Sequence, residues 1–139
     1  MEEFYGKKIL VVDDVPMSVA YLVKQLQSLG FTNIIQFTDS VEAWESFAEA
    51  QLSDNPYDLV ITDLNMPGMD GMDFISQIKN DEMSKDTKIV VVSADHDPLV
   101  IDEAMEHGVA EYITKPINLD ELKDKMEFVF KGLPFEISE

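Results

Sequence analysis

Five short runs of apolar residues, spaced at fairly even intervals, are the feature that most limits how this sequence can fold. Within each run the apolar residues mostly follow one another instead of alternating with polar ones, which is typical of strands covered on both faces. The runs are KILVV (8–12), NIIQF (33–37), DLVIT (58–62), KIVVV (88–92) and AEYIT (110–114).

The segments between these runs have the periodicity and the end signals of helices. The first helix has an apolar stripe that ends at Gly30, made of Val19, Leu22, Val23, Leu26 and Leu29. The others are indicated by Asp39 with Glu42, by Phe74, Ile75 and Ile78, by Asp97 before Pro98, and by Asn118 with Glu121. Strand and helix thus alternate five times. This pattern predicts an α/β fold, a doubly wound five-stranded parallel sheet with helices on both faces.

The composition sets limits on the class of protein. The 139 residues, 45% of them apolar, suit one globular domain, which we expect over residues 1–131 with a flexible tail at 132–139. The net charge is −18, and all ten basic residues are lysine, which argues against nucleic acid as a partner. There is no cysteine, no apolar run near the roughly 20 residues that span a bilayer, and no signal peptide. We therefore expect a cytoplasmic protein that does not bind a membrane.

Polar side chains follow the predicted strands where the carboxyl ends of a parallel sheet meet. In the common doubly wound strand order 2-1-3-4-5, Asp63 lies between an acid pair on one side and a hydroxyl and an ammonium group on the other. Clustered carboxylates suit Mg²⁺, and a lysine suits phosphoryl oxygens. A carboxylate is then the only evident nucleophile, so the pattern predicts an aspartate that accepts a phosphoryl group with the help of a metal. The residues at the strand ends are Asp13, Asp14, Thr38, Asp63, Ser93 and Lys115.

Four motifs carry a resemblance to a known family. They are VVDD (11–14), ITDLNMPGMDG (61–71), VVSA (91–94) and YITKP (112–116), with intervals of 93 − 63 = 30 and 115 − 93 = 22 residues. Over about residues 7–131 the sequence resembles the receiver domains of two-component response regulators, which are CheY-like. The resemblance implies the flavodoxin-like strand order 2-1-3-4-5.

The resemblance also implies a role for each residue of the site. Asp63 is the phosphoacceptor, and a sensor histidine kinase or a histidine phosphotransfer protein would supply the phosphoryl group. The metal ligands are Asp13, Asp14, Asp63 and the backbone carbonyl of Asn65, with Asp14 a more direct ligand than Asp13. Ser93 and Lys115 assist the chemistry, Ser93 and Tyr112 form the switch, and the Lys115–Pro116 peptide bond is cis.

The resemblance leaves the output of the switch open. It implies a change in the surface formed by helix 98–107, strand 110–114 and the last helix, with an unknown protein target. Met17 and Tyr21 share one helix face, where they would dock the phosphodonor. No residues remain for a DNA-binding output, and with Met1 in place we expect a stand-alone, monomeric receiver that turns over no external substrate. Two other functions stay open: a Mg²⁺-dependent phosphatase with an aspartyl nucleophile, and a phosphorylation-independent interaction module.

Overall fold

The computed structural model describes residues 2–132 and contains the predicted parallel sheet. The strands lie in the order β2-β1-β3-β4-β5, and all neighbours are parallel. The predicted fold class and strand order are therefore confirmed. The strands are β1 (Ile9–Val12), β2 (Ile34–Phe37), β3 (Leu59–Thr62), β4 (Lys88–Ser93) and β5 (Glu111–Thr114).

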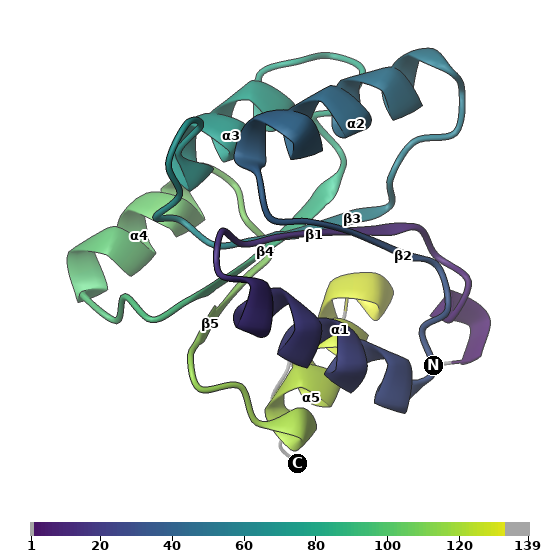
Figure 1. Cartoon of the computed structure of the whole chain (residues 1–139), viewed down its shortest axis with the longest axis vertical. Coiled ribbons are helices and arrows are strands. Elements are labelled where there is room, and N and C mark those ends of the chain that lie inside the picture. The colour runs from purple at the N-terminus through teal and green to yellow at the C-terminus, as the bar shows by residue number, and fades with distance from the viewer. Residues whose placement is uncertain (1, 133–139) are drawn as a thin grey trace.

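Helices cover both faces of the sheet. Figure 1 shows α1 and α5 below the strands, with α2 and α3 above them and α4 beside α3. The bounds are α1 (Pro16–Leu29), α2 (Ser40–Leu52), α3 (Gly71–Lys79), α4 (Pro98–Glu106) and α5 (Leu119–Lys131). None of these helices is both long and apolar enough to cross a bilayer.

Each strand contributes side chains to two separate cores, which explains its continuous apolar sequence. In β1, Leu10 and Val12 pack with α2 and α3, whereas Ile9 and Val11 pack with α1 and α5. All four of these side chains are at most 1% exposed. Alternating residues of one strand therefore stabilise opposite layers.

The helix ends follow the sequence signals. Gly30 ends α1 in the left-handed conformation at a φ of 115°. The carboxylate of Asp39 accepts hydrogen bonds from the amides of Val41 and Glu42 at the start of α2, and the side chains of Asp97 and Asn118 cap α4 and α5 in the same way. These caps satisfy amides that have no partner within the helix.

An N-terminal 3-10 helix, η1 (Glu2–Phe4), is the element that the sequence patterns missed. The ring of Phe4 stacks on Phe130 of α5 at a centroid distance of 5.2 Å, and Tyr5 meets Phe31 edge to face at 5.5 Å. The N-terminal segment thus packs across the far ends of α1 and α5. The predicted flexible tail at 132–139 lies, from residue 133 onward, outside the described residues.

Candidate functional site

Three carboxylates meet at the carboxyl edge of the sheet. Asp13 and Asp14 follow β1, and Asp63 follows β3, which pairs with β1 in parallel register. One oxygen from each of the three lies within 4.8 Å of the others. Asp13 is 6% exposed and Asp63 is 8% exposed, whereas Asp14 is half-buried. The crowding predicted from the strand ends is present.

Lys115, which follows β5, reaches back across the sheet to these acids. Its ammonium group lies 2.7 Å from Oδ2 of Asp13 and 3.1 Å from Oδ2 of Asp63. Its backbone amide donates to the carbonyl of Ser93 at 2.9 Å, which fixes its starting point, and the Lys115–Pro116 peptide bond is cis. One cation therefore serves two carboxylates that would otherwise repel each other.

The site holds its charges at some cost. Burial raises the pKa of Asp13, although the hydrogen bond and charge of Lys115 oppose the shift. Burial also acts to lower the pKa of Lys115, but the hydrogen bonds that its ammonium group donates to Asp13 and Asp63 outweigh this effect and leave that pKa above its usual 10.5. The stability that Lys115 contributes is thus fully present below pH 10.5 and is lost as the pH rises through its raised pKa.

The oxygens of the cluster differ in how free they are. Asp13 uses Oδ1 to accept from the amide of Val15 at 3.0 Å and Oδ2 to accept from Lys115. Asp63 accepts from the amide of Leu64 through Oδ1 and from Lys115 through Oδ2. Within residues 2–132, the carboxylate of Asp14 makes no hydrogen bond or ion pair. Asp14 therefore offers oxygens that the protein itself does not occupy.

The donor set fits a hard divalent cation. The ligand atoms that the structure brings together are carboxylate oxygens of the three aspartates, whereas Asn65, the fourth predicted ligand, is exposed in the loop after β3. Mg²⁺ prefers oxygen ligands and retains several waters, which the half-exposed side of Asp14 allows. The cluster could hold such a metal.

The chain directly after Asp63 is packed against the site. The amide of Gly71, where α3 begins, donates to the carbonyl of Leu64 at 2.9 Å. A Cβ atom at position 71 would collide with the backbone oxygen of Asp63 and with the Cα atom of Leu64. The start of α3 therefore lies against Asp63 only because residue 71 has no side chain.

The two predicted switch residues are both buried next to the site. Ser93 is 1% exposed, and its hydroxyl accepts from the amide of Asp95 at 3.1 Å. Tyr112 is 8% exposed, and its hydroxyl donates to the backbone carbonyl of Asp95 at 2.6 Å. Both side chains thus engage Asp95, and the ring of Tyr112 lies in a buried position in this structure.

Replacing Tyr112 by Phe should make the protein less sensitive to alkali. Burial raises the pKa of Tyr112 above 10.0, an effect that a hydrogen bond with Ser93 reduces. The folded state then keeps a proton that the unfolded state loses, so stability falls as the pH rises from about 10 through the raised pKa. Urea unfolding at about pH 8 and about pH 11 should show a smaller loss of unfolding free energy in Tyr112→Phe than in the parent. Equal losses would contradict this assignment. Tyr21→Phe is the control, because Tyr21 is 53% exposed in the parent protein.

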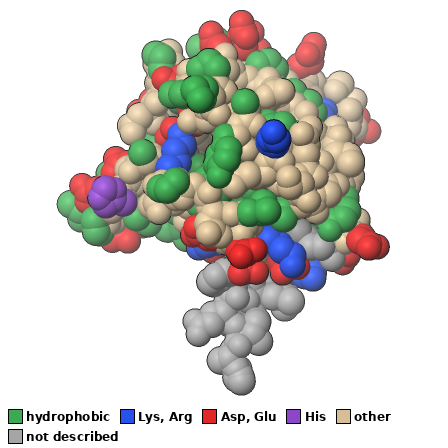
Figure 2. All heavy atoms as spheres, turned by 60° about the horizontal axis from the view of Figure 1, so that its bottom comes forward, with side chains coloured by type: hydrophobic (Ala, Val, Ile, Leu, Met, Phe, Trp, Pro, Cys, Tyr) green, Lys and Arg blue, Asp and Glu red, His purple; other side chains and the backbone are tan. Residues whose placement is uncertain are grey.

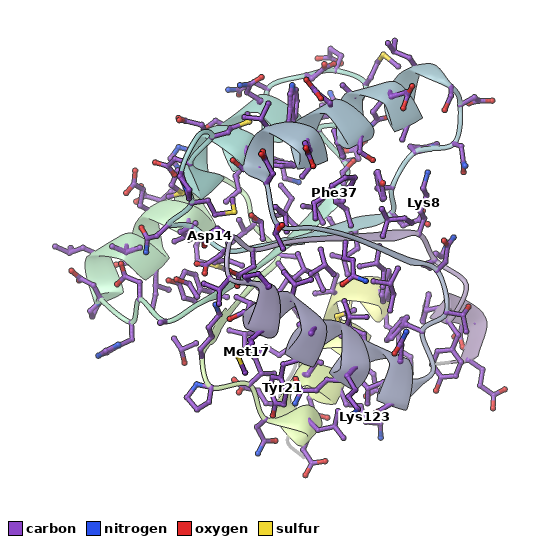
Figure 3. The ribbon with its side chains drawn as sticks, in the orientation of Figure 1. Lys8, Asp14, Met17, Tyr21, Phe37 and Lys123 are labelled. Atoms are coloured by element: carbon purple, nitrogen blue, oxygen red, sulfur yellow. The ribbon has the colours of Figure 1, made fainter. Side chains whose placement is uncertain are left out.

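A hollow of about 260 Å³ adjoins Lys115 and is bordered by α1 and the β5–α5 loop. Met17 and Tyr21 project from α1 on this side and are 83% and 53% exposed (Figure 3). Figure 2, which brings the α1 and α5 side forward, shows hydrophobic side chains reaching this surface with basic groups among them and acidic groups nearer its edges. The lining residues are Met17, Ser18, Tyr21, Lys115, Pro116 and Ile117.

Two residues near the site were not singled out from the sequence. The hydroxyl of Ser18 lies 3.4 Å from the ammonium group of Lys115. Ser40, at the start of α2, bonds to the loop that follows Asp63. Neither serine follows a strand, so the rule that collects the strand ends cannot find it.

The fold and the residues at its carboxyl edge define a class of phosphorylation-dependent signalling switches. The sequence profile of the response regulator receiver domain matches residues 9–127. The chain therefore belongs to this family, whose members act in two-component signalling.

Individual relatives agree with this assignment. The chain is 35% identical over 135 residues to the chemotaxis protein CheY-3 of Vibrio cholerae, covering 96% of this chain and 100% of that protein. It is also 35% identical to the chemotaxis protein CheY of Pseudomonas aeruginosa, covering 89% and 96%. Among solved structures, CheY4 of Vibrio cholerae matches with a TM-score of 0.77 at 26% identity, over 89% of this chain and 98% of that one. The CheX–CheY–BeF3–Mg²⁺ complex of Borrelia burgdorferi matches with a TM-score of 0.79 at 27% identity, over 89% of each chain.

Proposed function

We propose that this protein is switched by transfer of a phosphoryl group to Asp63 from a histidine kinase or a histidine phosphotransfer protein, in the cytoplasm. The observation that carries the proposal is the position of the Asp63 carboxylate, which lies among Asp13, Asp14 and Lys115 at the carboxyl edge of the sheet. Of the three acids, Asp63 is the one that follows the central strand β3, and it is buried. Membership of the receiver family supports the same role.

In the proposed reaction, an oxygen of Asp63 attacks the phosphorus atom of the donor. A new O–P bond forms as the bond between phosphorus and the donor's leaving group breaks, and the product is an aspartyl phosphate. Lys115, now 3.1 Å from Asp63, neutralises charge on the phosphoryl oxygens, and the hydroxyl hydrogen of Ser93 is a donor for the same group.

Asp14, Asp13, Asp63 and the carbonyl of Asn65 are the proposed ligands of Mg²⁺. When bound, Mg²⁺ supplies positive charge that offsets the repulsion between the carboxylates and the incoming phosphoryl group. Asp14, whose oxygens have no partner within residues 2–132, is the proposed direct ligand. Lys115 and the amide of Val15 already engage Asp13, which supports a more indirect part for that carboxylate.

The test is phosphorylation by a small donor. Incubation with acetyl phosphate and Mg²⁺ should increase the intact mass of the protein by one phosphoryl group, and addition of EDTA should prevent the increase. A protein that takes up no phosphoryl group under these conditions, or that takes it up equally well in EDTA, would overturn the proposal.

Met17 and Tyr21 support a docking surface for the phosphodonor protein. Both are exposed and border the hollow beside Lys115, so a donor seated there is close to Asp63. Met17→Ala should slow transfer from the phosphorylated histidine donor about tenfold, because the position of Met17 beside the hollow assigns it to the minority of interface residues whose truncation costs more than about 1 kcal/mol. Stopped-flow or quench-flow transfer assays measure this rate.

The control for Met17 is another exposed apolar residue on a different face. Leu52, at the end of α2, is 81% exposed and lies outside the hollow. Leu52→Ala should transfer at the parental rate. Equal slowing in both variants, or none in Met17→Ala, would exclude this docking surface.

For the output, we propose that Tyr112 is in equilibrium between its buried position and a more exposed one. Phosphorylation changes the fraction of molecules in each position. Movement of Ser93 toward the phosphoryl group changes the space beside Tyr112, and both residues engage Asp95 in the loop between β4 and α4. A shift of this kind alters the surface of α4, β5 and α5, to which a downstream protein would bind.

A further inference from the structure

The hydroxyl of Ser40 joins the start of α2 to a loop that lies 27 to 29 residues further along the chain. It donates to the carbonyl of Pro67 at 3.0 Å and accepts from the amide of Met69 at 2.8 Å. Ser40 is only 2% exposed. A buried hydroxyl with both a donor and an acceptor partner in one short loop is a specific attachment, since losing it removes both hydrogen bonds that join α2 to that loop.

Ser40 is itself held firmly. It is the first residue of α2, and the preceding residue, Asp39, caps the helix through hydrogen bonds from the amides of Val41 and Glu42 at 2.8 and 3.2 Å. The carbonyl of Asp39 also accepts from the amide of Ala43 at 3.0 Å. The attachment point therefore belongs to a capped helix end rather than to a free loop.

Within residues 2–132, the hydrogen bonds that tie the tip of this loop to another element come from Ser40, and the side chain of Met69 also packs against the core. Gly68 lies between the two bonded residues at a φ of 84°, a left-handed conformation that glycine adopts without strain. The amide of Met69 also bonds the carbonyl of Pro67 at 3.1 Å, but that contact lies within the same turn and attaches it to nothing else. Ser40 is the described hydrogen-bonding link between this turn and α2.

The same loop carries Asn65, whose backbone carbonyl is a proposed cation ligand. Its near end is fixed at Asp63 and Leu64, against which Gly71 packs, and the side chain of Met66 is 7% exposed. Pro67, two residues after Asn65, is the first point bonded to Ser40. The position of the Asn65 carbonyl is thus set from both sides.

We infer that Ser40 is a positioning residue that orients the Asn65 carbonyl for binding a divalent cation at the acidic cluster. The inference rests on the proposed function of that cluster. Groups that orient metal ligands without touching the metal commonly alter affinity by tenfold or more when removed. Ser40 would therefore affect cation binding from outside the cluster.

The experiment compares Ser40→Ala with Ser84→Ala. Ser84 is an equally buried serine, 3% exposed, whose hydroxyl donates to the carbonyl of Ile78 at 2.7 Å, away from the acidic cluster. Three quantities are measured for the parent and both variants: the melting temperature, the Mg²⁺ dissociation constant by calorimetry, and hydrogen exchange of the Met69 amide by NMR.

Both variants should lose a similar amount of melting temperature, because each loses a buried hydrogen-bonded hydroxyl. Only Ser40→Ala should raise the Mg²⁺ dissociation constant, by about tenfold, and only it should speed exchange at Met69. If Ser40→Ala does not fold, Ser40→Cys keeps the buried volume but replaces the hydroxyl by a weakly hydrogen-bonding thiol, and it gives the same comparison.

Two results overturn the inference while the proposed function stands. One is parental Mg²⁺ affinity in Ser40→Ala despite faster exchange at Met69, which makes the contact purely structural. The other is an equal loss of affinity in Ser84→Ala, which makes the effect one of general stability. A parent protein that binds no Mg²⁺ overturns the proposed metal site as well, so the two failures are distinguishable.

Discussion

The Asp63→Asn variant should take up no phosphoryl group from acetyl phosphate in the presence of Mg²⁺, whereas the parent takes up one. Asparagine has nearly the shape of aspartate, but its amide is not a nucleophile toward phosphorus under these conditions. The neighbouring acids cannot substitute, because Asp13 and Asp14 both follow β1 and neither lies at the end of the central strand β3, where Asp63 is placed. Intact mass, followed by peptide mapping of the parent, measures the result.

Asp14→Asn is the companion variant for this prediction. It keeps the acceptor Asp63 but removes one proposed cation ligand, so labelling should continue at a lower rate and need more Mg²⁺. Labelling of Asp63→Asn to the parental extent would assign the acceptor to another residue. A parental Mg²⁺ requirement in Asp14→Asn would remove Asp14 from the metal site.

Lys115→Met should lower the free energy of unfolding at pH 7 by about 2 kcal/mol, because it leaves two facing carboxylates without their cation. The side chains of Asp13 and Asp63 are 8% and 11% exposed, so water screens their repulsion poorly, while that of Lys115 is 21% exposed, which moderates the loss. Saturating Mg²⁺ should then stabilise Lys115→Met more than it stabilises the parent, since the metal replaces the missing positive charge. Urea unfolding with and without Mg²⁺ gives both quantities.

Lys125→Met provides the matched comparison. Lys125 of α5 pairs with Glu111 at 2.8 Å, and both side chains are 17% exposed, but the pair lies outside the acidic cluster. This variant should also lose stability, yet gain no more from Mg²⁺ than the parent does. If Mg²⁺ stabilises Lys115→Met and the parent equally, the lysine and the metal do not act on the same carboxylates.

The fold could be predicted from the sequence because its main signals are local. A strand buried on both faces must be apolar at successive positions, as Leu10 and Val11 are, and such strands belong to parallel sheets. The observed strand ends differ from the predicted ones by about one residue. Ser93, which we expected just beyond β4, is the last residue of that strand. Pairing with the neighbouring strand sets these limits, and a single segment does not contain that information.

The acidic cluster could also be predicted, since parallel strands bring Asp14 and Asp63 to the same edge whatever lies between them. The contact of Ser40 with Pro67 could not, because it joins a helix start to a loop and follows no periodicity. The buried position of Tyr112 could not be predicted from the sequence pattern either, since its side-chain rotamer depends on the contact with Asp95.

The packing of Phe4 on Phe130 has a practical consequence for labelling this protein. It places both ends of the described chain at the edge of the sheet that lies opposite to Asp14. The labels of Lys8 and Asp14, at the two ends of β1, mark these opposite edges (Figure 3). The four residues of β1 alone span about 13 Å. That distance exceeds the Debye length of about 8 Å at physiological ionic strength. A charged tag or dye attached before Phe4 is therefore separated from the acidic cluster by more than one Debye length, so this end of the chain is the better place for a label in measurements of cation binding and phosphoryl transfer.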